Sequence, residues 1–325
     1  MNAPACTTEE LISLKAIRAA ATRIAPHVNA TPLVRLIPIG LRLKAESLHP
    51  IGAFKLRGAF NAILSLTDAE RARGVIAYSS GNHAQAVSYA AHRLGVRAVI
   101  VMPDNAPRAK LEGTRRWGAE VVIVGPASAE RAARAQALQA AHGYILIPPF
   151  DARAIMEGTG TIGLEILGAA ADVDTVFAPV SGGGLLGGLA AAVKQLNPAV
   201  RVIGVEPELA DDAAQSLRAG RIVALSAQEV TRTIADGLRV QQLGDLTWPH
   251  IRSYVDEIIT VSEAEIRSAM RAIAAGAKLV AEPSGAVAAA GALKRGGDLS
   301  RSVAVLSGGN VDLDILAEIL GEATA

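Results

Sequence analysis

The stretch Phe177-Ala-Pro-Val-Ser-Gly-Gly-Gly-Leu-Leu-Gly-Gly188 decides the fold of this chain. An apolar run over Thr175–Val180 predicts a buried strand, and the apolar residues that follow predict a helix over Leu185–Leu196. Glycine amides at such a junction, unshielded by side chains, can bind phosphate at the positive end of a helix. A strand that passes through glycines into a helix is typical of parallel α/β proteins.

Strands and helices alternate on both sides of this stretch. Upstream, apolar runs predict strands over 75–78, 98–102, 120–124 and 144–147, with helices over 84–94, 108–117 and 129–141. Downstream, the pattern predicts strands over 200–205, 258–261 and 302–306, and helices over 262–279, 283–293 and 313–320. We therefore predict the α/β class, with parallel sheets and flanking helices. The chain divides into a small lobe, 73–143, and a large lobe built from 1–72 and 144–325.

The bulk composition excludes several classes of protein. Of the 325 residues, 50% are hydrophobic and 19% are charged, which is typical of a folded globular chain. The net charge is +1 without a basic run, so we expect neither nucleic acid nor a membrane surface as a partner. The uncharged stretch 178–193 contains a proline and many glycines and predicts no membrane span.

The N-terminal region predicts a cytoplasmic protein. Cys6 is the single cysteine, which excludes an internal disulfide and a thiolate metal cage and favours a reducing compartment. The region lacks the pattern of a signal peptide. Thr7 and Glu10 instead have the spacing of a capping box that opens a helix.

Three polar or glycine-rich segments follow predicted strands: Ser79–His83, Ser181–Gly184 and Ser307–Asn310. Ligands of open parallel sheets bind beyond the carboxyl ends of the strands. We therefore expect these segments to share one cleft.

The glycine segment has more than one interpretation. Gly182, Gly184 and Gly187 spell G-x-G-x-x-G after a strand, and Glu206 follows about 20 residues later, as in dinucleotide-binding proteins. This pattern favours an NAD-dependent oxidoreductase. The glycines could also serve only close packing of a helix on a sheet.

Lys55 stands alone after a glycine turn, at the start of an apolar helix. A desolvated lysine has a depressed pKa and can form an imine with an aldehyde. A surface lysine whose stem covers the helix is the alternative. The segment Ser79-Ser-Gly-Asn-His83 combines hydroxyls, an amide, an imidazole and helix N–H groups, a set that suits a carboxylate. An N-cap serine beside an exposed histidine is the alternative there.

Taken together, these segments resemble the fold-type-II pyridoxal phosphate (PLP) enzymes, specifically the threonine/serine dehydratase and serine racemase family, whose fold is tryptophan synthase β-like. The matching stretches occur in the family's order over nearly the whole chain: Gly52-Ala-Phe-Lys-Leu-Arg-Gly-Ala, Ser79-Ser-Gly-Asn-His-Ala-Gln, Ser181-Gly-Gly-Gly-Leu, Ile203-Gly-Val-Glu-Pro, Thr233-Ile-Ala-Asp-Gly, Glu282-Pro-Ser-Gly-Ala and Leu306-Ser-Gly-Gly-Asn-Val-Asp. No regulatory domain follows the last predicted helix, so we expect the short, catabolic type.

The resemblance implies a role for each matching residue. Lys55 would bind PLP through an imine and move the Cα proton of the substrate, and Ser80 would lie across the cofactor from it. Further cofactor contacts would come from the phosphate loop (Gly182, Gly183, Gly184, Leu185), the ring neighbours (Phe54, Gly237), the ring hydroxyl contact (Asn82) and the ring nitrogen contact (Ser307). The substrate carboxylate would bind to Ser79, Asn82 and His83.

The implied activity is elimination of water from a β-hydroxy amino acid, L-threonine or L-serine, which gives a 2-oxo acid and ammonia. Racemisation is the alternative, because a hydroxyl at Ser80 could deliver a proton to the opposite face. The departure Glu157-Gly-Thr-Gly-Thr, where the family usually has Ala-Gly-Gln-Gly-Thr, keeps phenylserine and hydroxyaspartate open as substrates.

The resemblance also implies a metal site and a homodimer. Glu206, the backbone carbonyl of Ala210, and Asp212 match the family's divalent-metal ligands, and oxygen ligands suit Mg²⁺ or Ca²⁺. A solvated acidic turn is the alternative for this segment.

Overall fold

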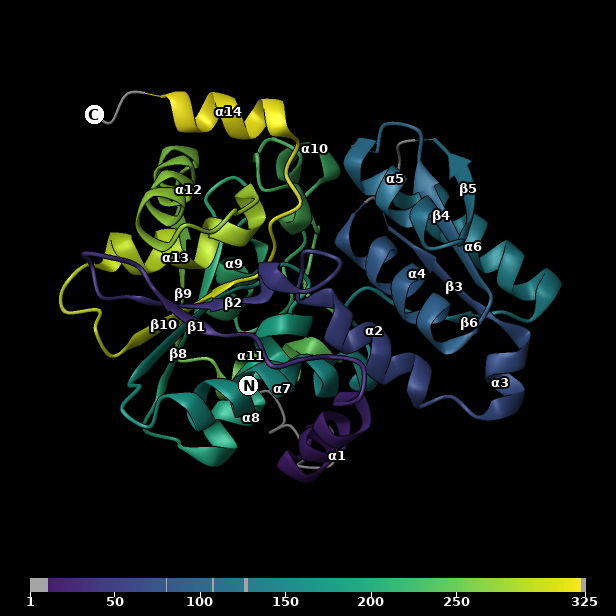
Figure 1. The fold of residues 1–325 in the computed structure, drawn as a ribbon, viewed down its shortest axis with the longest axis horizontal. Coiled ribbons are helices and arrows are strands. Elements are labelled where there is room, and N and C mark those ends of the chain that lie inside the picture. The colour runs from purple at the N-terminus through teal and green to yellow at the C-terminus, as the bar shows by residue number, and fades with distance from the viewer. Residues whose placement is uncertain (1–10, 80, 107, 126–127, 323–325) are drawn as a thin grey trace.

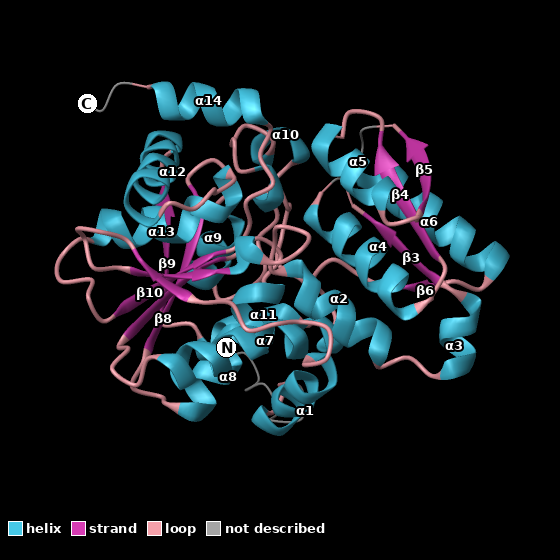
Figure 2. Cartoon of the chain, in the orientation of Figure 1, coloured by secondary structure: helices cyan, strands magenta, loops and turns pink. Residues whose placement is uncertain are grey.

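The computed structural model describes residues 11–79, 81–106, 108–125 and 128–322, and these form two lobes (Figure 1). Thr7, Glu10 and Ser80 lie outside the described residues, so the predicted capping box and the predicted role of Ser80 stay predictions. Each lobe has a sheet flanked by helices (Figure 2). The predicted α/β class is therefore correct.

The large lobe is built on a six-stranded sheet in the order β1-β2-β10-β7-β8-β9. Only the edge pair β1 and β2 is antiparallel, and the other neighbours are parallel. The strands are β1 (Leu33–Arg35), β2 (Arg42–Ala45), β7 (Thr175–Pro179), β8 (Arg201–Pro207), β9 (Glu257–Val261) and β10 (Ser302–Leu306).

Alternation along the central strands builds a core on each face of this sheet. In β7, Phe177 packs into one apolar cluster, whereas Val176 and Ala178 pack into another. Successive side chains of a strand point to opposite faces, so both faces are covered. The helix α13 (Pro283–Arg295) contacts one face, and α8 (Gly184–Leu196) contacts the other.

The other helices of the large lobe surround these layers. Helix α12 (Glu263–Ala277) begins with a capping box, in which the Ser262 hydroxyl accepts a hydrogen bond from the Glu265 amide. The remaining elements are α1 (Leu14–Ile24), α2 (Lys55–Leu64), α7 (Arg153–Ala169), α9 (Asp212–Ala219), α10 (Ala227–Val230), α11 (Thr247–Tyr254), α14 (Leu313–Gly321) and the 3₁₀ turns η1 (Glu46–Leu48) and η2 (Asp236–Leu238).

The small lobe has a parallel four-stranded sheet in the order β5-β4-β3-β6. Its strands are β3 (Val75–Tyr78), β4 (Ala98–Pro103), β5 (Glu120–Val124) and β6 (Ile145–Leu146), and its helices are α3 (Asp68–Arg73), α4 (Asn82–Leu94), α5 (Arg108–Arg116) and α6 (Ser128–His142). The last strand, β6, pairs with β3, so this sheet extends just beyond the predicted lobe boundary at residue 143.

Helices α2 and α7 lie where the lobes meet (Figure 1). The apolar face of α2 packs on α4 of the small lobe, and α2 also packs on α7 of the large lobe. A Cβ on Gly158 in α7 would lie 2.7 Å from the Arg57 carbonyl oxygen, so only glycine allows this approach. Within the described ranges, no helix is long and apolar enough to cross a membrane.

Candidate active site

The site is built from loops that follow the carboxyl ends of β3, β7 and β10. A bridge between Ala53 and Gly308 brings the turn before α2 against the loop after β10. The Phe54 amide donates a hydrogen bond of 3.0 Å to the Ser307 carbonyl in the same place. Lys55 therefore begins its helix directly beside the end of the central sheet.

Lys55 is partly buried between the lobes. Its Nζ donates a hydrogen bond of 2.6 Å to the Pro149 carbonyl and lies 5.1 Å from the centre of the Phe54 ring. Burial removes water from the ammonium and lowers the pKa of Lys55 to about 8. A neutral amine, the form that attacks an aldehyde, is thus accessible close to neutral pH.

A buried ionic network fixes the helix that carries this lysine. The Arg57 guanidinium donates to both carboxylate oxygens of Glu46, at 2.7 and 2.9 Å, and to both oxygens of Glu165, at 2.6 and 2.8 Å. Burial alone would raise the pKa of Glu46, but the Arg57 charge holds that pKa well below its usual range. This two-sided clamp, close to Lys55 in the first turn of the helix, restrains the position of the lysine.

Residues 182–184 of the glycine loop carry no side chains of their own. Gly183 has φ +87°, and Ser181 has φ 56°, which is unusual for a residue with a Cβ. The Gly182 carbonyl accepts a hydrogen bond of 2.7 Å from the Thr247 hydroxyl. The Gly184 carbonyl accepts one of 2.8 Å from the Thr159 hydroxyl. The first amides of any helix have no partner within the helix, so those of Gly184 and Leu185 at the start of α8 suit an anion site, whereas the Gly183 amide donates a hydrogen bond of 3.2 Å to the Val180 carbonyl.

The linker between β6 and α7 touches several parts of the site. The Pro149 carbonyl accepts from Lys55, and the next residue, Phe150, packs so closely that a Cβ on Gly182 would lie 2.5 Å from its ring. The Asp151 carboxylate then accepts backbone N–H groups of 245–247 at 2.9–3.2 Å, and so holds the start of α11, which carries Thr247. The sequence alone gave Asp151 no role.

The serine-asparagine loop opens α4. The side-chain amide of Asn82 donates a hydrogen bond of 2.5 Å to the Glu282 carboxylate. The side-chain oxygen of Asn82 accepts a hydrogen bond of 2.8 Å from Asn310. The Ser79 hydroxyl accepts 3.2 Å from the Gly81 amide. His83 is buried and donates 2.9 Å through Nε2 to the Ile147 carbonyl. Burial first, and then the nearby charge of Lys55, lower the pKa of His83 to about 3, so its imidazole is neutral.

This arrangement corrects the view of His83 as an exposed side chain. Its Nε2 faces the protein interior, and its part in carboxylate binding stays a prediction.

Ser307 and Gly237 lie on the same side of the site, joined by Ser284. The Ser307 hydroxyl donates a hydrogen bond of 3.4 Å to the Ser284 carbonyl. The Ser284 hydroxyl accepts a hydrogen bond of 2.8 Å from the Gly237 amide. The Ser181 hydroxyl donates 3.3 Å to the Gly237 carbonyl, which connects this side to the glycine loop. Hydrogen bonds thus connect Gly237 to Ser284, Ser307 and the glycine loop, and Phe54 with Lys55 lies directly beside Ser307.

The predicted metal ligands form a separate site at the end of β8. The buried Oε1 of Glu206 and both carboxylate oxygens of Asp212 have no hydrogen-bond partner. Burial raises the pKa of Glu206 well above its usual value and that of Asp212 to about 7. Ala210 is also buried in this turn. In the described ranges no cluster of three His, Cys, Asp or Glu side chains could hold a metal, so a cation here needs backbone or water oxygens in addition.

The acidic segment is therefore not a solvated turn. The fit of these unpartnered carboxylates to a divalent cation is good, because a buried carboxylate needs a compensating charge. Glu206 is 1% exposed, which leaves it unable to contact the ribose of a bound dinucleotide.

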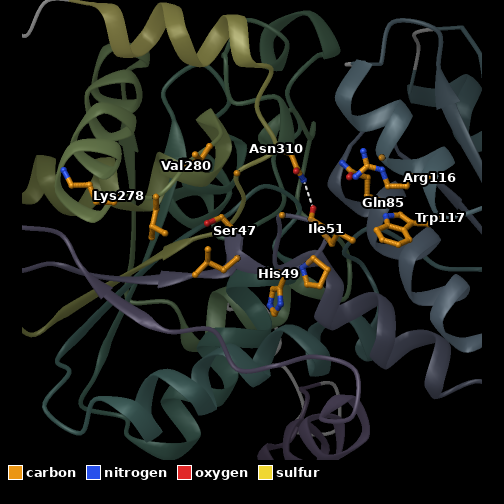
Figure 3. A pocket seen from close by; sticks show the side chains of 15 residues that line it. Ser47, His49, Ile51, Gln85, Arg116, Trp117, Lys278, Val280 and Asn310 are labelled. Carbon is orange, nitrogen blue, oxygen red and sulfur yellow. Dashed lines mark hydrogen bonds between the residues drawn. The ribbon is translucent and has the colours of Figure 1, made fainter.

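A cavity of about 540 Å³ lies between the lobes near the turn before α2 (Figure 3). It is lined by His49, Gln85, Trp117, Lys278 and Asn310, among others, but not by Lys55 or the glycine loop. Asn310 donates 2.7 Å to the Ile51 carbonyl, drawn as a dashed line in Figure 3, and also contacts Asn82.

Comparison with known proteins agrees with this geometry. The family model described as "Pyridoxal-phosphate dependent enzyme" matches residues 24–308. The chain belongs to this family of pyridoxal-phosphate-dependent enzymes. Membership removes the NAD-dependent alternative: the glycine segment resembles a dinucleotide motif only in its spacing.

Within the pyridoxal-phosphate-dependent family, several curated relatives are similar over most of the chain. The serine racemase of Oryza sativa subsp. indica is 42% identical, with 94% of this chain and 93% of the relative covered. The L-threo-3-hydroxyaspartate ammonia-lyase of Saccharomyces cerevisiae is 41% identical, with 93% and 94% covered. The catabolic L-threonine dehydratase of Escherichia coli K12 is 43% identical, with 86% and 85% covered.

Solved structures of the family have the same fold. The maize serine racemase has a TM-score of 0.89 and 39% identity, with 94% of this chain and 96% of that chain covered. The T.th. threonine deaminase has a TM-score of 0.87 and 48% identity, with 93% of this chain and 99% of that chain covered. The predicted fold-type-II architecture is confirmed.

Proposed function

We propose that this chain removes the hydroxyl group of a β-hydroxy amino acid, L-threonine or L-serine, and yields a 2-oxo acid and ammonia. The observation that carries this proposal is the desolvated amine of Lys55, held beside glycine amides that suit a phosphate.

The residues present fit pyridoxal phosphate. Gly183 lies in a left-handed conformation, and a Cβ there would lie 2.7 Å from the Thr247 hydroxyl, so the loop depends on glycine to leave its amides open. Those amides and the N-terminus of α8 would hold the phosphate, and Lys55 would bind the aldehyde carbon. When bound, the cofactor supplies a sink for the electrons left at the substrate Cα.

The chain's own groups would then control protons and orientation. Lys55, with its pKa lowered to about 8, is suited to take the Cα proton when the substrate amine has displaced it. Ser307 would offer a neutral hydroxyl to the ring nitrogen, which would not force that nitrogen to carry a proton. Ser79 and Asn82, with the N-terminus of α4, would orient the substrate carboxylate.

Racemisation is the second candidate, because similar relatives are named serine racemase. It requires a proton donor on the face opposite Lys55, and we propose Ser80 for that role from the family resemblance. We favour elimination because a hydroxyl on Cβ that takes up a proton can leave as water, in competition with reprotonation at Cα. The hydroxyaspartate ammonia-lyase relative keeps a more polar substrate open.

A substrate panel tests the proposal. The PLP-loaded protein is incubated with L-threonine, L-serine, L-threo-3-hydroxyaspartate and phenylserine, and release of 2-oxo acid and ammonia is measured beside chiral analysis of the remaining amino acid. Elimination predicts stoichiometric 2-oxo acid and ammonia from threonine or serine. Loss of enantiomeric purity without 2-oxo acid would replace elimination by racemisation.

We also propose a divalent cation, Mg²⁺ or Ca²⁺, at Glu206, Asp212 and the Ala210 carbonyl. The unpartnered carboxylate oxygens support it. A homodimer and a cytoplasmic location are further proposals from the family resemblance and from the single cysteine; light scattering on the purified protein tests the first.

A further inference from the structure

Lys110 crosses from one lobe to the other. It is carried by α5 in the small lobe, and its side chain is 5% exposed. Its Nζ lies 2.5 Å from Asp236 Oδ2 and 3.4 Å from Glu282 Oε2, and both carboxylates belong to the large lobe. The stem of Lys110 passes under the serine-asparagine loop, where a Cβ on Gly81 would lie 3.4 Å from its Cδ.

Both carboxylates hold residues of the site. Glu282 accepts 2.5 Å from the Asn82 amide through its other oxygen. Asp236 directly precedes Gly237, and its carboxylate accepts a hydrogen bond of 3.4 Å from the Ser284 hydroxyl. The same hydroxyl accepts a hydrogen bond of 2.8 Å from the Gly237 amide. Lys110 is thus the cation of a network that ends on two expected neighbours of the cofactor ring, Asn82 and Gly237.

Charge makes this network depend on its lysine. One ammonium faces two carboxylates, of which Glu282 is buried and Asp236 is partly exposed. Burial lowers the pKa of Lys110, but Glu282 and Asp236 outweigh burial and raise it, so the lysine stays charged. Removing one partner from a buried ion pair leaves uncompensated charge, which is strongly unfavourable. Without Lys110, Asp236 and Glu282 would repel each other and separate.

We propose that Lys110 is a positioning residue, which joins the two lobes and holds Asp236 and Glu282 where they set Gly237 and Asn82 around the cofactor. The proposal rests on the proposed function, in that pyridoxal phosphate binds between these groups. It assigns no contact of Lys110 with the substrate.

A double-mutant cycle tests this role. Lys110→Met keeps the stem and removes the charge, Asp236→Asn removes one carboxylate, and the double variant removes both. Lys194→Met is the matched control, because Lys194 pairs with Asp256 at 2.7 Å within the large lobe. For each variant we would measure the PLP affinity of the apo-protein, and the visible absorbance and the KM and kcat for threonine of the PLP-loaded protein.

We expect Lys110→Met to weaken PLP binding at least about tenfold and to shift the absorbance of the bound cofactor. The double variant should regain most of this loss, because Glu282 then no longer faces a second carboxylate. Lys194→Met should match the wild type. If Lys110→Met fails to fold, the double variant carries the test: PLP affinity equal to that of Asp236→Asn supports the coupling, and clearly weaker affinity contradicts it.

Wild-type affinity and absorbance in Lys110→Met would overturn the proposal, and so would strictly additive losses in the cycle. A wild-type protein that binds no PLP would instead contradict the proposed function, so the two failures are distinguishable.

Discussion

Substitution of Gly183 by alanine tests the phosphate loop directly. The residue has φ +87°, which costs an alanine about 1–2 kcal/mol relative to glycine. The new Cβ would also lie 2.7 Å from the Thr247 hydroxyl and 3.0 Å from a methyl group of Leu243, and such overpacking costs about 1–3 kcal/mol. Together, the strain and the clash cost about 2–5 kcal/mol of free energy. This cost falls on the native conformation of the loop whose amides would hold the phosphate.

Gly220→Ala is the matched control for this variant. Gly220 has φ +67° at the end of α9, but a Cβ there would meet nothing within 4 Å. It therefore shares the backbone strain of about 1–2 kcal/mol without the clash and without the site.

The assay is titration of each apo-protein with PLP, followed by absorbance, together with denaturant unfolding of the same apo-proteins. We expect Gly183→Ala to weaken PLP binding by about 100-fold, equivalent to about 2.7 kcal/mol. Gly220→Ala should lose stability but keep its affinity. If both variants bound PLP as tightly as the wild type, the loop could not be the phosphate site.

Other consequences follow from the same geometry. The pKa of Lys55 is lowered to about 8, and the neutral amine is the reactive form. The rate at which the apo-protein takes up PLP should therefore rise with pH and level off above about pH 8. A rate that keeps rising toward the ordinary lysine pKa of 10.5 would argue against a desolvated amine. Saturating Mg²⁺ or Ca²⁺ at about 100 times its Kd should stabilise the protein by about 2.7 kcal/mol in thermal unfolding, and chelation should reverse this. Asp212→Asn should abolish that response without destabilising the metal-free protein, because it relieves the repulsion with Glu206; an unchanged metal response in this variant would place the cation elsewhere. Ser80→Ala should impair one enantiomer of the substrate more than the other, measured by initial rates, whereas equal losses would contradict a face-specific donor.

Much of the fold could be predicted because its strands are short, apolar and bounded by turn residues. Val75–Tyr78, Glu120–Val124 and Ser302–Leu306 coincide with their predicted limits. In contrast, α7 was not predicted, because its segment Glu157-Gly-Thr-Gly-Thr-Ile-Gly is rich in residues with low helix propensity. Tertiary packing explains this helix: a Cβ on Gly160 would lie 3.0 Å from the Gly188 carbonyl, so small residues allow α7 and α8 to approach closely.

The site was predicted where one motif carries one role, and missed where roles depend on partners far apart in the sequence. The glycine loop and Lys55 stand out locally. Lys110 and Asp236 are 126 residues apart, and only the fold of both lobes brings them together. Asp236 and Glu282 do lie in the segments that carry the family resemblance, and this was the available signal for them.

Reduction of the PLP-loaded protein with borohydride, followed by proteolysis and mass spectrometry, examines the covalent link itself. The geometry predicts one modified peptide, with the reduced cofactor on the Nζ of Lys55, and none in Lys55→Ala. Cofactor attached to a different lysine, or full turnover by the alanine variant, would contradict the assignment of this site.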